Sequence, residues 1–118
     1  MQDIDVFVIN GAIQVPQSLT GLHSGDSVAW GFHSTDTQVQ WAEIEFSNPA
    51  YKFFADRGGA KVSKRLMKLE SGHGNIVGTA PELGEHGSRP AKYTVRVRAT
   101  QHGPALHELD PVIVICDP

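Results

Sequence analysis

The chain has 118 residues, 40% of them hydrophobic and 19% charged, with a formal net charge of −3. This length predicts a single domain over residues 1–118 with a core of its own, and the acidic balance argues against nucleic-acid binding, which needs clustered Lys and Arg. The single cysteine excludes an intramolecular disulfide, and no apolar stretch approaches the about 20 residues that span a membrane.

The first half of the chain is predicted to form strands separated by turns. Ile4, Val6 and Val8 share one face of a strand, because neighbouring side chains in a strand point to opposite faces. Asn10-Gly11 behind it is a strong turn signal. Two further strands are predicted in this half: residues 27–33 and residues 37–46.

The second half alternates again after a segment that the pattern does not define. Residues 47–74 remain unassigned, apart from a helical turn over 47–54, capped by Ser47 or Asn48, and a loop with a short strand over 62–69. Tyr93, Val95 and Val97 are expected to face the core. The other predicted segments are strands at 75–80, 91–100 and 111–116 and loops at 81–90 and 101–110.

Six to eight short strands, separated by turns and with little helix, predict an all-β fold, an antiparallel β-sandwich. The first ten residues carry neither a basic segment nor a long apolar run, so no signal peptide is expected. That favours the cytoplasm if Met1 is the native start, and the periplasm or secretion if a signal was removed.

Two stretches of the sequence resemble the cupredoxins, a family of β-sandwich electron carriers. "SGDSVAW" followed by a polar loop and "VQW", and later "AKYTVRV" followed by a final apolar strand, carry this resemblance over about residues 25–39 and 91–115. It implies a cupredoxin-like sandwich. An immunoglobulin-like sandwich is the alternative.

The same resemblance implies that the copper ligands of the family are missing. A type 1 copper site takes two His and one Cys, with a weak axial Met. Thr37 stands where the first His is expected, Val97 where the Cys is expected, and residues 99–110 contain no Met. Cys116 lies on the next strand, so it is interpreted as a small hydrophobic side chain.

Histidines in glycine-rich loops are candidate metal ligands. In an up-and-down arrangement His73, His102 and His107 fall at one end of the sandwich, with Glu108 and Asp110 close in sequence. Three imidazoles and a carboxylate suit Zn²⁺ or Cu²⁺. The alternative is that these histidines are solvated surface residues and that the protein has no cofactor.

Two features point to contact with another protein. Trp41 shares its strand face with Glu43 and Glu45, which predicts either a core position at a bulge or an exposed aromatic for protein or carbohydrate contact. The apolar run containing Val112 and Val114 is expected to be buried on both faces or paired across an interface.

The expected function is therefore a non-catalytic interaction or structural module that binds a protein partner or itself. A metal-binding protein is the first alternative. A small hydrolase that uses Ser24 or Ser34 with His33 and Asp36 is the second, although no nucleophile-elbow motif supports it.

Overall fold

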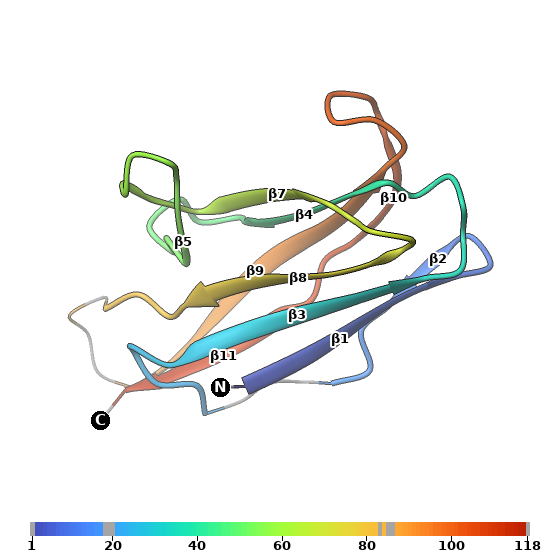
Figure 1. Ribbon diagram of the computed structural model, residues 1–118. Helices are drawn as coiled ribbons and strands as arrows, with labels where there is room; N and C mark the ends of the chain where they lie inside the picture. The colour runs from blue at the N-terminus through green and yellow to red at the C-terminus, as the bar shows by residue number, and fades with distance from the viewer. Residues whose placement is uncertain (1, 18–20, 83, 85–86, 118) are drawn as a thin grey trace.

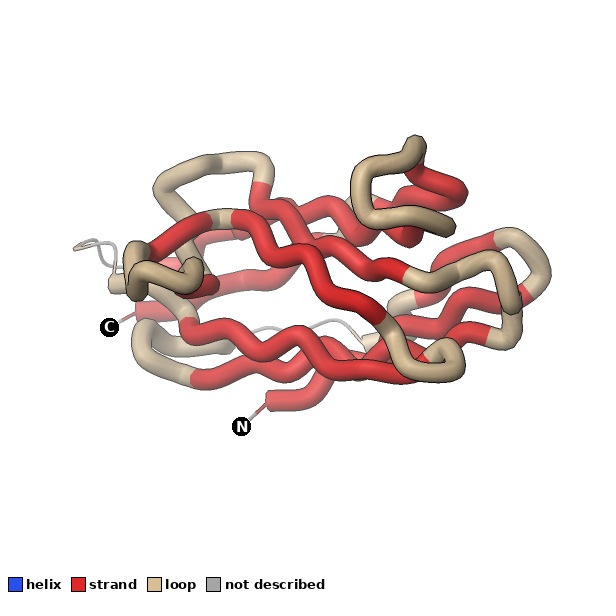
Figure 2. Tube along the Cα trace, turned by 45° about the horizontal axis from the view of Figure 1, so that its top comes forward, coloured by secondary structure: helices blue, strands red, loops and turns tan. Residues whose placement is uncertain are grey.

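The computed structural model describes residues 2–17, 21–82, 84 and 87–117. This part of the chain contains strands joined by turns and loops, without a helix (Figures 1 and 2). The eleven strands are β1 (Gln2–Ile9), β2 (Ala12–Gln14), β3 (Ser27–Ser34), β4 (Trp41–Phe46), β5 (Phe54–Ala55), β6 (Lys61–Val62), β7 (Lys64–Lys68), β8 (His73–Thr79), β9 (Gly87–Arg98), β10 (Ala105–Leu109) and β11 (Val112–Asp117). The predicted all-β sandwich is confirmed, and eight strands remain when β2, β5 and β6, the shortest, are set aside. The described residues include no helix long and apolar enough for a membrane crossing.

Two sheets form the sandwich. The first has the order β2-β1-β3-β8, in which β1 and β3 are parallel (blue and cyan in Figure 1). The second has the order β10-β9-β4-β7. Strand β9 is its longest member: β10 pairs with its second half and β11 with its first half, so these two strands follow one another along β9.

A backbone bridge joins the loop before β3 to the second sheet. The Leu22 amide donates to the Val114 carbonyl at 3.2 Å, and the Cys116 amide donates to the Leu22 carbonyl at 2.7 Å. The Leu22 side chain is itself buried. This segment therefore ties β11 to the chain that enters the first sheet.

The core lies between the two sheets and is filled by the inward side chains of each strand. Ile4, Val6 and Val8 are buried as predicted, and so are Tyr93, Val95 and Val97. Alternation along each strand places these residues on one face, and their burial supplies the main stabilising free energy.

The prediction of a loop at 101–110 is wrong for the second half of that segment. Residues Ala105–Leu109 form β10 and pair with β9. The register shifts between Ala105 and His107, and such a bulge breaks the period-two pattern by which strands are recognised. The predicted loop at 81–90 is also too long, because β9 begins at Gly87; residues 83, 85 and 86 of that segment lie outside the described residues.

The helical turn predicted at 47–54 is wrong. Asn48 instead begins a single turn: its side-chain oxygen accepts a hydrogen bond from the Ala50 amide at 2.9 Å. The Tyr51 amide donates to the Asn48 carbonyl at 3.0 Å. Asn in this position stabilises a turn through its own side chain, which a helix N-cap signal resembles in sequence.

Of the two alternatives for the last strand, burial on both faces is wrong, and pairing across an interface stays a prediction. Ile113 and Ile115 are fully buried, whereas Val112 is 45% exposed and Val114 is half-buried. One face of β11 belongs to the core, and the other faces outward. The run is apolar throughout, so its sequence does not reveal that the two faces differ.

Gly72→Ala is expected to lower the free energy of unfolding by about 3 kcal/mol, measured by urea denaturation. Ser71 and Gly72 both have positive φ, 52° and 81°, in the tight turn between β7 and β8. A Cβ at Gly72 would also collide with the backbone oxygen of Ser34.

Gly25→Ala is the matched control, expected to cost about 1 kcal/mol. Gly25 also has a positive φ, 88°, but nothing lies within 4 Å of the position of its Cβ. Equal decreases in the free energy of unfolding for the two variants would show that the contact with Ser34 has no effect on stability.

Candidate functional site

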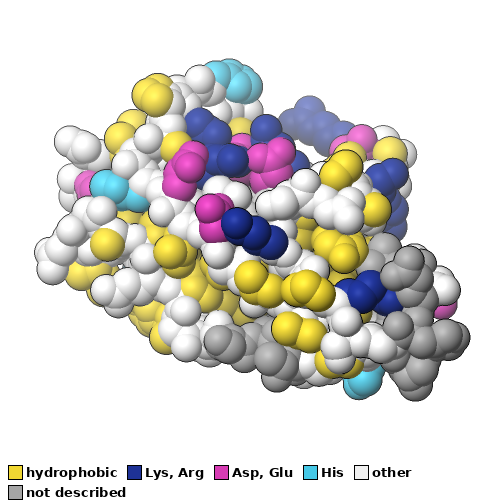
Figure 3. All heavy atoms as spheres, turned by 180° about the vertical axis from the view of Figure 1, so that it is seen from behind, with side chains coloured by type: hydrophobic (Ala, Val, Ile, Leu, Met, Phe, Trp, Pro, Cys, Tyr) yellow, Lys and Arg dark blue, Asp and Glu magenta, His cyan; other side chains and the backbone are white. Residues whose placement is uncertain are grey.

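The outer face of the second sheet carries a network of charged side chains around Glu43. We use the name charged network for Glu43, Glu45, Lys64, Arg96, Arg98 and Glu108. Glu43 is only 2% exposed, and within the described residues it is the single charged side chain that is buried. Figure 3 shows these positive and negative groups gathered on one face of the molecule.

The pairing of β4 with β9 builds this network. Glu43 lies opposite Arg96 and Trp41 opposite Arg98, all on the face turned away from the core. Glu108 on β10 lies beside Arg96 from the other side. Strand register therefore places acids and bases in alternating positions across neighbouring strands, where opposite charges attract.

Arg96 connects the acids of the network. Its Nη1 donates to Glu43 Oε2 at 2.8 Å and to Glu45 Oε1 at 2.6 Å, and its Nε donates to Glu108 Oε1 at 2.9 Å. The hydrogen bonds to Glu43 and Glu45 raise the pKa of Arg96. A planar guanidinium makes these contacts through a fixed fork of donors, which the ammonium group of a lysine lacks.

Glu43 remains ionised although it is buried. Burial alone would raise its pKa, but the Arg96 hydrogen bond, the charge of Lys64 and the Arg98 hydrogen bond together hold the pKa below its ordinary value. The distances are 3.2 Å to Arg98 Nη2 and 3.5 Å to Lys64 Nζ. The network therefore carries fixed charges at neutral pH.

Next to the network lies a row of apolar side chains on the same face. We name Pro90, Val112, Val114 and Cys116 the valine strip; Val112 lies opposite Lys92 and Val114 opposite Pro90 in the β9–β11 register. Val112 is 45% exposed, and Val114 and Cys116 are half-buried. Figure 3 shows hydrophobic side chains gathered beside the charged group. Thr94 Oγ1, which donates to Asp110 Oδ1 at 2.7 Å, links the two areas.

Trp41 lies at the far side of the charged network from the valine strip. It is half-buried at the start of β4, paired with Lys68 and Arg98 on the outward face. Alternation along the sequence placed Trp41 on the same strand face as Glu43 and Glu45, and the structure agrees. Val39, two residues before Trp41, would lie on the same face if the strand extended to it. It is buried, because it precedes the start of β4.

The three histidines predicted as metal ligands lie in different surroundings. His73 on β8 has its ring 5.6 Å from the ring of His33. His102 lines a surface hollow with Glu43, Lys64 and Arg98. His107 on β10 has its Nε2 3.9 Å from Asp36 Oδ2. In the part of the chain that the structure describes, no three His, Cys, Asp or Glu side chains form a group that could hold a metal ion.

The residues considered for hydrolysis also have separate partners. Ser34 Oγ donates to the Asp36 carbonyl at 3.2 Å, and Ser24 Oγ donates to the Pro81 carbonyl at 3.0 Å. His33 Nε2 lies 3.3 Å from Asp5 Oδ1 instead. Cys116 Sγ lies 3.4 Å from Ser88 Oγ on the outward face of β11, so it is not a core side chain.

The sequence already contained the signal for the charged network, but not its partners. Glu43 and Glu45 alternate with apolar residues, and Arg96 and Arg98 do the same. Arg96 and Arg98 were therefore expected to face outward, whereas the position of the face that Glu43 and Glu45 share with Trp41 was left open. That β4 lies beside β9 is a fact of tertiary pairing, which local periodicity does not contain.

Neither protein-family models nor curated protein sequences match this chain. Among solved structures, the fold is similar to the McoA multicopper oxidase from the hyperthermophile Aquifex aeolicus, with a TM-score of 0.51 and 7% sequence identity. The likeness covers 98% of this chain but 29% of that chain, so the present chain spans less than a third of its length. At this identity the likeness concerns the fold, and it supports a cupredoxin-like β-sandwich. The absence of the type 1 copper ligands stays a prediction; Thr37 is exposed and Val97 lies in the core.

Proposed function

We propose that this domain is a non-catalytic interaction module, and that its valine strip binds a second copy of the chain. The observation that carries the proposal is the exposure of apolar side chains on β11, where Val112 is 45% exposed although its neighbour Ile113 is fully buried. Apolar side chains that gather on a surface and are rimmed by charges are typical of protein contacts.

The charges around the strip favour a second copy over other partners. Lys92 lies opposite Val112 on β9, and Asp110 precedes β11, so both signs flank the strip. In a two-fold dimer the same patch faces itself, and a cation of one copy can then meet a carboxylate of the other. A partner of uniform charge would find repulsion as well as attraction.

The size of the strip predicts a weak dimer. It covers one face of one strand pair, and small interfaces of this kind are typical of transient complexes. The charged network beside it adds specificity of orientation rather than affinity, because its charges are already paired with one another.

The contacts of the histidines and serines give the two alternatives less support. A Cu²⁺ or Zn²⁺ site made of His73, His102 and His107 would need side chains that here belong to three different surroundings. A hydrolase would need a serine hydroxyl within reach of an imidazole. Ser34 and Ser24 instead donate to backbone carbonyls.

Val112→Lys is expected to abolish self-association without unfolding the domain. In sedimentation equilibrium, the weight-average mass of the wild type should rise with protein concentration up to the solubility limit. The mass of the variant should stay that of the monomer. The added cation would be placed beside Lys92 on the strip. Circular dichroism checks that the variant is folded.

Val77→Lys is the matched control, because Val77 on β8 is the other large exposed hydrophobic side chain of the described residues, at 52% exposure. It belongs to the first sheet and should associate like the wild type. A wild type that is monomeric at every concentration would refute the second copy as partner. Loss of association in Val77→Lys rather than Val112→Lys would place the contact elsewhere.

A further inference from the structure

A second polar cluster lies on the outer face of the first sheet, over a glycine. Asp5 on β1, Gly31 on β3 and Asn75 on β8 are aligned in one row across the three strands. Because Gly31 has no side chain, the row has a gap at its centre. A Cβ placed there would lie 3.3 Å from Asn75 Oδ1, 3.6 Å from His33 Nε2 and 3.8 Å from Asp5 Oδ1. Three potential metal ligands thus converge on one point.

Neighbouring side chains fix the orientation of two of these ligands. Gln17 Nε2 donates to Asp5 Oδ2 at 2.8 Å, which leaves Asp5 Oδ1 directed toward His33. The Phe7 ring stacks on the His33 ring at a centroid distance of 5.1 Å and an interplanar angle of 26°. Metal sites use such outer contacts to set the direction of their ligands.

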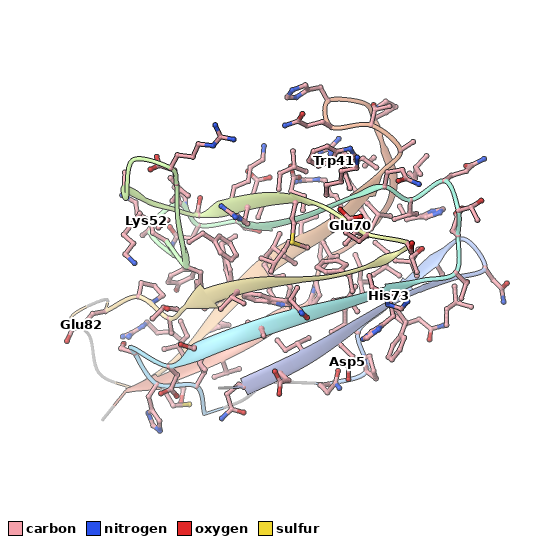
Figure 4. All side chains as sticks on the ribbon, in the orientation of Figure 1. Asp5, Trp41, Lys52, Glu70, His73 and Glu82 are labelled. Carbon is pink, nitrogen blue, oxygen red and sulfur yellow. The ribbon has the colours of Figure 1, made fainter. Side chains whose placement is uncertain are left out.

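His73 lies opposite His33 in the next row, with ring centroids 5.6 Å apart (Figure 4). His73 therefore lies on the same face as Asp5, His33 and Asn75 but is not part of the ligand set.

We infer that Asp5, His33 and Asn75 form a binding site for a divalent transition-metal ion over Gly31, with water completing the coordination. Two donors at about 2.1 Å from a tetrahedral Zn²⁺ lie about 3.4 Å apart. Asp5 Oδ1 and His33 Nε2 are 3.3 Å apart, which fits. One carboxylate, one amide oxygen and imidazole nitrogen suit Zn²⁺ or Cu²⁺ rather than Ca²⁺.

This site differs from the trio of histidines considered from the sequence. It uses an amide oxygen as third ligand, so it is not among groups made of His, Cys, Asp and Glu alone. Asp5 and His33 side chains are each 42% exposed, which leaves one side open for the ion to enter and for water to complete its coordination. The site lies on the sheet opposite the valine strip and is independent of the proposed dimer.

The glycine itself provides the sharpest test. Gly31→Ala places a methyl group at the point of convergence and removes no ligand, although Asn75 Oδ1 must shift by a few tenths of an ångström. Alanine is compatible with this strand because Gly31 has no positive φ. Untagged, metal-free protein is titrated with ZnCl₂ and with CuCl₂, and calorimetry monitors the binding. The wild type should bind one equivalent of metal ion. Gly31→Ala, His33→Ala and Asn75→Ala should each weaken binding by about tenfold or more.

His102→Ala is the control, because His102 lies in the loop before β10, beside Glu43 on the other sheet. It should bind like the wild type. Undiminished binding by Gly31→Ala would overturn the inference, and so would loss of binding in His102→Ala, or a wild type that retains no metal. Circular dichroism of each variant separates loss of the site from loss of the fold.

Discussion

Trp30→Ala is expected to lower the free energy of unfolding by about 3–5 kcal/mol, the largest effect of any substitution considered for this chain. The Trp30 side chain is fully buried on β3. Its ring lies 5.6 Å from that of Tyr93 and 6.2 Å from that of Phe46, both on the second sheet. Removal of the indole would leave a cavity between the sheets. Domains of this class have a total stability of only about 5–15 kcal/mol.

The measurement is urea denaturation followed by fluorescence of the remaining tryptophan, Trp41. The midpoint temperature of thermal unfolding should fall by about 10–20 °C. Trp41→Ala is the control, since Trp41 is half-buried on the outward face and its loss should cost less than half as much. Equal losses for the two variants would contradict the central position of Trp30.

Arg96→Met is expected to cost about 3 kcal/mol, because it leaves Glu43 buried with weaker partners. The remaining cations are Arg98 at 3.2 Å and Lys64 at 3.5 Å. Glu45 and Glu108 would also lose their partner and repel Glu43. Arg96→Lys should recover part of the loss, since a lysine keeps the charge but lacks the fork that reaches three carboxylates. Full stability of Arg96→Met in urea denaturation would show that the network is only a surface feature.

The same network predicts how stability depends on pH. The pKa of Glu43 is lower in the folded protein than in the unfolded chain, so this carboxylate stabilises the fold above its ordinary pKa of about 4.5. That stability is lost as the pH falls through the lower folded value. In Arg96→Met the folded pKa rises, and the loss should begin at higher pH. Glu43→Gln should remove this part of the acid dependence, which urea midpoints measured across the acid range would show.

Strands with regular alternation were predictable from the sequence, and those with interruptions were not. The alternation of Ile4, Val6 and Val8 and the Asn10-Gly11 turn both agree with the structure, in which Asn10 and Gly11 have φ of 52° and 76°. Strand β10 was missed because it follows Gly103-Pro104 and contains a bulge. The start of β9 was missed because Gly87 and Pro90 are residues typical of loops, although Pro90 takes its place opposite Val114.

The candidate sites were less predictable than the strands, because each is assembled from several strands. Alternation placed Asp5 and Phe7 on the outward face of the first strand. It could not indicate that β3 lies parallel to β1, with Gly31 directly beside Asp5. Val112 and Val114 were identified from an apolar run, but their exposure follows from which side of β11 meets the core, and Ile113 and Ile115 occupy that side.

The bridge between Leu22 and β11 has a consequence for the order in which the protein folds. Leu22 and β11 lie near opposite ends of the sequence, so the hydrogen bonds of Leu22 with Val114 and Cys116 close a loop that contains most of the chain. Such closure has a large entropic cost, whereas the β1–β2 and β9–β10 hairpins form from neighbouring residues. The hairpins are therefore expected to form early, and the bridge only after β9 has already aligned β11. Folding on the millisecond-to-second scale of sandwiches rich in non-local pairs follows from this order.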